Sequence, residues 1–304
     1  MGLRIRWPGS WPSQPVVVPA SFALYYGWPS AVNGASGAVD AVVETFARFP
    51  VLVLGDGLQQ EAHPDHAATA TVLQRLEASA TRVFGYVDLG IRTQNLPVAT
   101  VLSYAQAWRG LGVAGIFLDD AGADFGVDLA RRREVVAALH RVGLRVILNA
   151  HAPADALAEA VGLRPGDGYL FESFLISDGR VEPTRDQLAK ADQTLRLAAG
   201  TGVDVYAVAT GPEDDPLLAT KRDYAWWMCA LYGFKHFQYT TIDYGAGAAR
   251  LTAWQPEPPD LGSRYLDETV EHLWESGTHR RRTDRGEIRV TSGPALGGAF
   301  IPRS

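Results

Sequence analysis

Eight short apolar runs recur along the chain about every 30 residues, and this period limits the folds that the chain can adopt. The runs cover residues 22–26, 51–55, 83–87, 115–119, 145–149, 168–172, 203–209 and 236–240. The segments between them have apolar residues at helical spacing. In 39–49, for example, Val39, Val42, Val43 and Phe46 fall on one helical face. The sequence therefore predicts alternating strands and helices.

The composition of the runs indicates how the strands are arranged. They are almost continuously apolar, which is typical of parallel strands covered by helices. Eight such units predict an α/β fold, a (β/α)8 TIM barrel. A doubly wound sheet is the alternative, but it usually has a glycine-rich turn after its first strand, and "YYGWPS" is not one. We expect one domain over 1–304, with the barrel at about 21–260. A helix at 265–275 and a short C-terminal β-hairpin are expected within 261–304.

Charge and cysteine content narrow the classes of function. The 304 residues carry a net charge of -6, which argues against nucleic-acid or anionic-membrane partners. The single cysteine, Cys229, excludes an intrachain disulfide and a cysteine-based zinc site. No apolar run is long enough to cross a membrane, and no signal peptide is visible. We expect a soluble, cytoplasmic protein, or an extracellular one if a signal has been removed; the oligomeric state is open. The run RRR at 131–133 is expected to be a solvated helix face.

Polar and aromatic side chains follow the strands at their carboxyl ends, where barrel enzymes place their functional groups. They are Tyr26, Asp56, Tyr86, Asp88, Asp119, Asp120, Asn149, His151, Glu172 and Tyr239. No lysine lies at a predicted strand end, which argues against Schiff-base aldolase chemistry. Glycine-rich phosphate loops are absent after the seventh and eighth runs.

This set of residues suits an uncharged sugar substrate and cleavage by two carboxyl groups. We expect Asp119 or Asp120 to face Glu172 across the barrel mouth. Because "GYLFESF" surrounds Glu172 with apolar residues, burial should raise the pKa of this carboxyl and make it the acid. The predicted substrate-binding residues are Tyr26, Asp56, Tyr86, Asp88, Asn149, His151 and Tyr239. No cofactor is expected.

Four segments resemble a group of barrel glycosidases: "RVFGYVDLG", "GVAGIFLDDAG", "LRVILNA" and "GYLFESF". The group comprises the spherulin-4-like hydrolases, the endo-α-1,4-polygalactosaminidases and the hydrolase domain of Pel-polysaccharide-processing proteins. The resemblance covers roughly residues 21–175. It implies Asp119 as nucleophile and Glu172 as acid/base, with the role of Asp120 open. It also implies secretion and a galactosamine-containing polysaccharide as substrate.

The sequence thus predicts a retaining glycoside hydrolase, with its two carboxyl groups about 5–5.5 Å apart. Its partner would be an α-linked oligo- or polysaccharide. Two alternatives are kept. One is a non-catalytic carbohydrate-binding barrel. The other is a metal-dependent hydrolase using Asp119, Asp120 and Asp124 together with His151.

Overall fold

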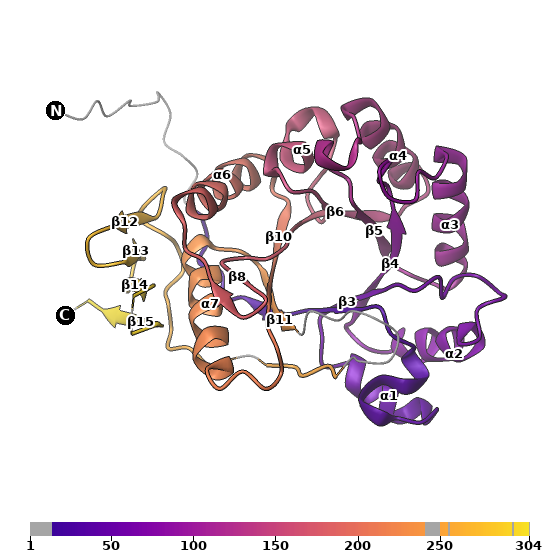
Figure 1. Cartoon of the computed structure of the whole chain (residues 1–304), viewed down its shortest axis with the longest axis horizontal. Coiled ribbons are helices and arrows are strands. Elements are labelled where there is room, and N and C mark those ends of the chain that lie inside the picture. Colours follow the sequence, from indigo (N-terminus) through magenta and orange to yellow (C-terminus); the bar gives the residue numbers. More distant parts are fainter. Residues whose placement is uncertain (1–13, 241–249, 255, 294, 304) are drawn as a thin grey trace.

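The computed structural model describes residues 14–240, 250–254, 256–293 and 295–303, and a parallel sheet closed into a barrel forms its centre. The strand order is β1-β11-β10-β7-β6-β5-β4-β3-β2, and β1 and β2 are consecutive in the chain (Figure 1). The predicted (β/α)8 barrel is confirmed. The strands are β1 Ala20–Ser21, β2 Ala23–Tyr25, β3 Val51–Leu54, β4 Arg82–Asp88, β5 Gly115–Asp119, β6 Arg145–Asn149, β7 Gly168–Phe171, β10 Asp204–Thr210 and β11 His236–Thr240.

The first barrel strand is divided at Phe22, and this division forms the seam of the barrel. β1 pairs with β11, whereas β2 pairs with β3. The backbone N–H of Phe22 donates to the Phe237 carbonyl at 3.4 Å. The N–H of Leu24 donates to Oε1 of Gln238 at 2.8 Å. A side-chain amide therefore takes the place of a backbone acceptor where the strand ladder is interrupted.

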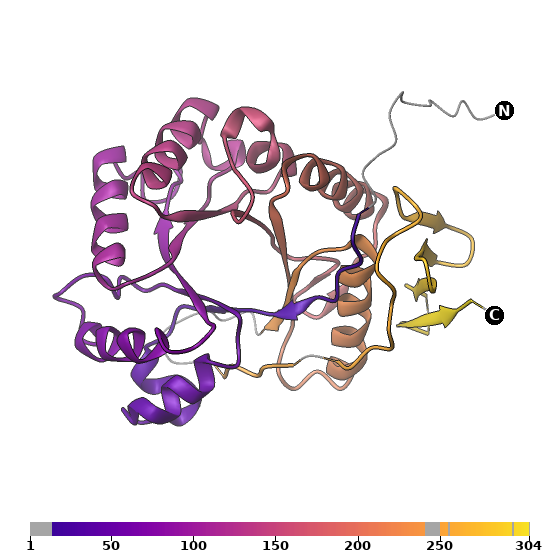
Figure 2. The ribbon, with the colours of Figure 1, turned by 180° about the vertical axis from the view of Figure 1, so that it is seen from behind.

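Helices surround the barrel (Figures 1 and 2). They are α1 Val39–Phe46, α2 His66–Leu76, α3 Val98–Gly110, α4 Leu129–Arg141, α5 Pro153–Leu157, α6 Arg185–Thr201 and α7 Leu218–Tyr232, with 3-10 turns at Pro29–Gly34, Ala123–Phe125 and Glu159–Val161. Strand side chains alternate between two cores. Phe84 and Phe117 belong to the core inside the barrel, and Leu118 and Phe171 to the layer under the helices. This burial on both faces explains the continuous apolar runs.

A glycine in the barrel wall makes room for a large side chain of α3. Trp108 of α3 is fully buried, and its Nε1–H donates to the Tyr86 carbonyl at 3.0 Å. Its ring covers Gly85 of β4 so closely that an added Cβ would lie 2.2 Å from ring atoms. Any side chain at this position would push α3 away from the strand.

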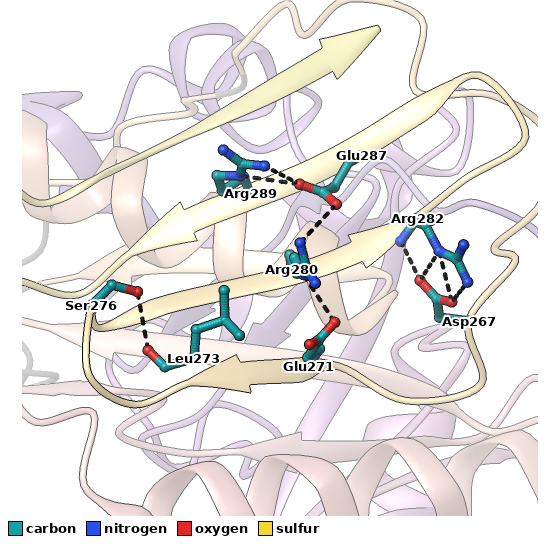
Figure 3. A network of polar contacts seen from close by, with 8 residues as sticks. All are labelled: Asp267, Glu271, Leu273, Ser276, Arg280, Arg282, Glu287 and Arg289. Carbon is teal, nitrogen blue, oxygen red and sulfur yellow. Dashed lines mark hydrogen bonds and ion pairs between the residues drawn. The ribbon is translucent and has the colours of Figure 1, made fainter. Parts of the chain in front are cut away.

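The C-terminal part forms a separate antiparallel sheet beside α7 (Figure 2). Its strands are β12 Glu271–Leu273, β13 Thr278–Arg282, β14 Gly286–Thr291 and β15 Gly297–Pro302, so the expected hairpin is part of a four-stranded sheet. Two further short strands, β8 Ile176–Ser177 and β9 Arg180–Val181, form a small hairpin after β7. Ion pairs of Arg280, Arg282 and Arg289 with nearby carboxylates lie on the larger sheet (Figure 3). Such exposed pairs contribute little stability.

The predicted helix at 265–275 is wrong. Tyr265 is buried there and donates its hydroxyl hydrogen to the Ala230 carbonyl at 2.6 Å, and the Arg281 guanidinium lies 3.8 Å from its ring centre. Residues Glu271–Leu273 pair with β13 instead of forming a helix. Contacts with the barrel and with the next strand therefore override the local helical pattern. None of the helices in the described ranges is long and apolar enough to span a membrane.

Replacing Gly85 with alanine should destabilise the barrel, because the rigid indole of Trp108 leaves no room for a methyl group. We expect a loss of about 1–3 kcal/mol in the free energy of unfolding, measured by urea denaturation. Gly110, at the end of α3, is the matched control because an added Cβ there meets nothing within 4 Å. Gly110→Ala should be neutral or stabilising by up to about 1 kcal/mol. Equal stability of the two variants would contradict the packing described.

Candidate functional site

Three neighbouring barrel strands bring three predicted site residues into contact. Asp119 ends β5, Asn149 ends β6, and Glu172 directly follows β7. Because the strands are parallel, their carboxyl ends meet at one end of the barrel. The side-chain amide of Asn149 donates to Oδ1 of Asp119 at 2.7 Å and to Oε2 of Glu172 at 3.0 Å. One nitrogen therefore holds two carboxyl groups side by side.

Asp119 has the most perturbed carboxyl group of this cluster. Burial, together with the neighbouring charges of Asp120 and Glu172, raises its pKa to about 7. Hydrogen bonds from the Asn149 amide and from the Asp120 backbone oppose this shift. Protonated and ionised Asp119 are consequently both populated near neutral pH, as a proton donor and acceptor requires.

The adjacent Asp120 points to a different set of partners. Its backbone is left-handed, with φ of 50°, so the chain turns sharply at this residue. Burial and the nearby charge of Asp88 raise the pKa of Asp120 to about 6, and a hydrogen bond with Thr93 lowers it. Asp88 is buried and accepts from the Gly90 N–H and the Thr93 hydroxyl, both at 2.8 Å. The two consecutive aspartates therefore have different partners: Asp119 contacts Asn149, whereas Asp120 lies near Thr93 and Asp88.

Aromatic rings form the floor beside the carboxyl groups. Tyr26 packs edge-on against Tyr86 with ring centres 5.1 Å apart, and Tyr86 lies above Phe117 of the inner core. Burial, together with the charges of Asp119 and Asp88, raises the pKa of Tyr86 far above its ordinary value. Its hydroxyl therefore keeps its proton beside the carboxylates.

An internal ion pair fixes the loop that follows β5. Arg132 of α4 is buried and donates to the carbonyls of Ala121 at 3.0 Å and Val127 at 2.7 Å. It also donates to Oδ1 of Asp155 at 3.1 Å, whose Oδ2 accepts from the Ala123 N–H at 2.9 Å. The loop after Asp119 and Asp120 is therefore held at both of its ends.

The preceding arginine fixes the loop after β4. Arg131 donates through Nε to the Leu89 carbonyl at 3.1 Å and through a terminal nitrogen to the Leu96 carbonyl at 2.5 Å. The expectation that 131–133 is a solvated helix face is therefore wrong for Arg131 and Arg132 and holds only for the exposed Arg133. Sequence reasoning missed both arginines, because a run of like charges is usually solvent-exposed.

Three predicted site residues are not in this cluster. Tyr239 lies on the outer face of β11, because alternation along the strand points Gln238 inward and Tyr239 outward. Asp56 is exposed, accepts from Trp28 Nε1 at 2.9 Å and lies 3.4 Å from His63. His151 is exposed and forms no hydrogen bond or ion pair with the described residues.

The expected burial of Glu172 is also wrong. Its neighbours Phe171 and Phe174 are buried, but Glu172 itself is an exposed residue. The strand ends at Phe171, so Glu172 lies beyond the sheet. Its assignment as a buried acid fails, and the raised pKa that was expected of Glu172 is found at the half-buried Asp119.

A lysine close to the cluster was missed because it lies on a helix. Lys190 of α6 has its ammonium 4.4 Å from the centre of the Phe171 ring. Burial lowers its pKa to about 8, and the nearby carboxylates of Glu172 and Asp124 oppose this shift. The only sequence feature that could have placed Lys190 near the site is its position in α6, the helix that follows β7.

The alternative of a metal centre is not supported by the described part of the chain. Within it, no group of three or more histidine, cysteine, aspartate or glutamate side chains is placed to hold a metal ion. Asp119, Asp120 and Asp124 are near one another in sequence, but with His151 they do not assemble into such a group.

Comparison with known proteins gives matches only among solved structures. No family model and no curated protein matches the chain. The YdjI aldolase from Escherichia coli K12 is 16% identical, with a TM-score of 0.45, over 74% of this chain and 75% of the aldolase. A deoxyribose phosphate aldolase from Aeropyrum pernix is 14% identical, with a TM-score of 0.45, over 74% and 86%. The Pseudomonas stutzeri endoglucanase Cel5A is 11% identical, with a TM-score of 0.44, over 66% and 75%.

These comparisons correct the predicted function. The similar barrels are mostly aldolases and lyases, and the polygalactosaminidase group is not represented among them. The prediction of a galactosamine-specific glycoside hydrolase is therefore wrong and is not carried further. The barrel fold rests on the strand order of the structure, and matches at this identity and TM-score carry no argument about activity. The function must be argued from the site itself.

Removing the charge of Arg132 should destabilise the protein strongly. In Arg132→Met, Asp155 and two loop carbonyls lose their partner, and we expect the free energy of unfolding to fall by about 3 kcal/mol. The exposed neighbour gives the control, because Arg133→Met should change it by less than about 0.5 kcal/mol. Denaturant titration measures both. Similar losses in the two variants would show that Arg132 does not hold the loop.

The raised pKa of Asp119 has a consequence for stability. The folded state holds this proton more tightly than the unfolded chain, so the stability that Asp119 contributes should fall as pH rises from about 4 to about 7. Asp119→Asn lacks this ionisation. Its stability relative to wild type should therefore increase over that range and level off above it. The control is Glu61→Gln, which changes an exposed carboxylate. Denaturation at several pH values measures the difference, and a constant difference would refute the raised pKa.

Proposed function

We propose that this protein is an enzyme that catalyses proton transfer on a polar, uncharged substrate at the Asp119 cluster. The observation that carries the proposal is the Asn149 amide shared by Asp119 and Glu172, together with the rise of the Asp119 pKa to about 7. A carboxyl group with a pKa near the working pH can donate a proton in one step and accept one in the next.

Each group of the cluster has a role in this proposal. Asp119 is the proton donor and acceptor. Glu172 is exposed, so a substrate can reach it, and its carboxyl group can accept a hydrogen bond from a substrate hydroxyl. Asn149 holds the two carboxyl groups next to each other by donating a hydrogen bond to each. Tyr86 keeps its proton and directs its hydroxyl hydrogen bond to the carboxyl group of Asp119.

The charge around the site supports an uncharged substrate. Asp88, Asp119, Asp120 and Glu172 gather at the ends of β4, β5 and β7. None of them has an ion-pair partner among the described residues. Such a concentration of carboxyl groups repels anions. Hydroxyl and carbonyl groups, in contrast, find both donors and acceptors here, which suits isomerisation or elimination beside such a group.

The test is deuterium uptake from D2O into uncharged hydroxy ketones, hydroxy aldehydes and polyols, followed with product formation by NMR. Wild type should exchange at least one of them, with a rate that changes around pH 7. Asp119→Asn and Glu172→Gln should lower kcat by a factor of about 10²–10⁴. Glu61→Gln, an exposed carboxylate elsewhere, should leave it unchanged.

Two results would contradict the proposal. One is the absence of both exchange and product for every compound with folded wild-type protein. The other is an exchange rate that persists in Asp119→Asn. Circular dichroism of each variant separates loss of catalysis from loss of fold.

A further inference from the structure

Two histidines face each other where the C-terminal sheet meets the barrel. His272 of β12 and His279 of β13 are opposite each other in the antiparallel ladder, and their Nδ1 atoms are 2.8 Å apart. His279 is only 2% exposed. At this distance one nitrogen must donate and the other must accept, because two N–H groups cannot face each other. The pair therefore shares a single Nδ1 proton.

The pair is part of a chain of hydrogen bonds that joins the sheet to two barrel helices. On one side, Nε2 of His272 lies 3.3 Å from Oδ2 of Asp192 on α6. On the other side, Nε2 of His279 lies 2.7 Å from Oγ of Ser292, which follows β14. That oxygen is 2.8 Å from the hydroxyl of Tyr224 on α7. The five side chains thus connect α6 to α7 through the sheet.

One arrangement of protons gives every group in this chain a partner. Tyr224 donates to Ser292, and Ser292 donates to Nε2 of His279. His279 donates from Nδ1 to His272, which donates from Nε2 to the Asp192 carboxylate. Both imidazoles are then neutral. One further proton fits on Nε2 of His279, but a second would place hydrogens on both Nδ1 atoms. The chain therefore tolerates one positive charge and not two.

The surroundings oppose the second charge. Burial, together with the charge of His272, lowers the pKa of His279 to about 4, and Asp192 opposes this shift. The other titratable and charged side chains that face the chain among the described residues are Tyr232 of α7, Arg281 of β13 and Arg185 of α6, which covers the Trp274 ring beside His272. An unfolded histidine takes up its proton near pH 6.5. The stability that His279 contributes is thus complete above about pH 6.5 and is lost as the pH falls to about 4.

We propose that the His272–His279 pair is a pH-dependent contact, which holds β12 on the barrel at neutral pH and releases it when both imidazoles are protonated. β12 is an edge strand of three residues, so it has a neighbour on one side only. The rest of the sheet has contacts that need no histidine. Arg281 donates to the Leu231 carbonyl of α7 at 3.3 Å, and Gly298 of β15 packs directly on Trp227. The release is therefore local, and it is independent of the reaction at Asp119.

The release is measured by amide hydrogen exchange of β12 and β13, corrected for the intrinsic rate at each pH. In wild type the opening of these strands should increase at least about tenfold between about pH 7 and about pH 5, while β5 and β6 keep their protection. His279→Asn cannot take up the proton and should show no such increase. His151→Asn, which removes an exposed imidazole, should behave as wild type.

The sharing of a proton is measured by NMR titration of the imidazole nitrogens. The midpoint of His279 should lie below that of the exposed His151. It should rise in His272→Asn, because the neighbouring positive charge is removed while the amide oxygen can still accept from Nδ1 of His279. This variant changes a less deeply buried residue, so it decides the outcome if His279→Asn does not fold.

Four results would overturn the proposal. The first two are equal protection of β12 at both pH values and an equal loss of protection in β12 and the barrel strands. The third is an acid-induced opening that persists in His279→Asn. The fourth is a midpoint of His279 that is unchanged in His272→Asn, which would show that burial alone perturbs this residue.

Discussion

A single side-chain amide, that of Asn149, holds together the part of this protein where chemistry can occur. It contacts Asp119 on one side and Glu172 on the other. Three parallel strands must end at the same level for one nitrogen to reach both carboxyl groups. The barrel meets this requirement, because the carboxyl ends of β5, β6 and β7 are neighbours in the sheet. Burial at the strand end raises the pKa of Asp119, and the Asn149 amide limits that rise.

The carboxyl groups of Asp119, Asp120 and Glu172 repel one another, and the surrounding structure keeps them from moving apart. Burial and like charges raise the pKa values of Asp119 and Asp120. Free loops would relax this repulsion by moving apart. Arg131 and Arg132, consecutive on α4, prevent the movement by binding carbonyls of the loops after β4 and β5. The positive charges act on the backbone and not on the carboxyl groups of the Asp119 cluster, so they fix positions without neutralising the site.

The barrel could be predicted from the sequence because burial on both faces of each strand leaves a visible apolar run. For the same reason Asp119, Asn149 and Glu172 could be predicted to lie at one end of the barrel, but Asp119 was expected across the mouth from Glu172, whereas both carboxyl groups contact the same Asn149 amide. The predictions that were wrong concern side chains whose environment depends on residues far away in the sequence or on the exact end of a strand. The outward direction of Tyr239 depends on the register of β11, and the exposure of Glu172 depends on where β7 ends. The burial of Arg132 depends on Asp155, 23 positions along the chain. The chemistry inferred from short similar segments proved less reliable than the fold.

The most direct test of this account is a pH titration of the Asp119 carboxyl carbon by NMR in protein labelled with ¹³C at aspartate, with Asp119→Asn used to assign the signal. The account predicts a titration midpoint near pH 7. It further predicts that the midpoint rises in Asn149→Ala, because the amide hydrogen bond that favours the ionised form is then lost. A midpoint near the ordinary aspartate value of about 3.9 would show that Asp119 is an unperturbed carboxylate and would contradict the proposed proton-transfer site.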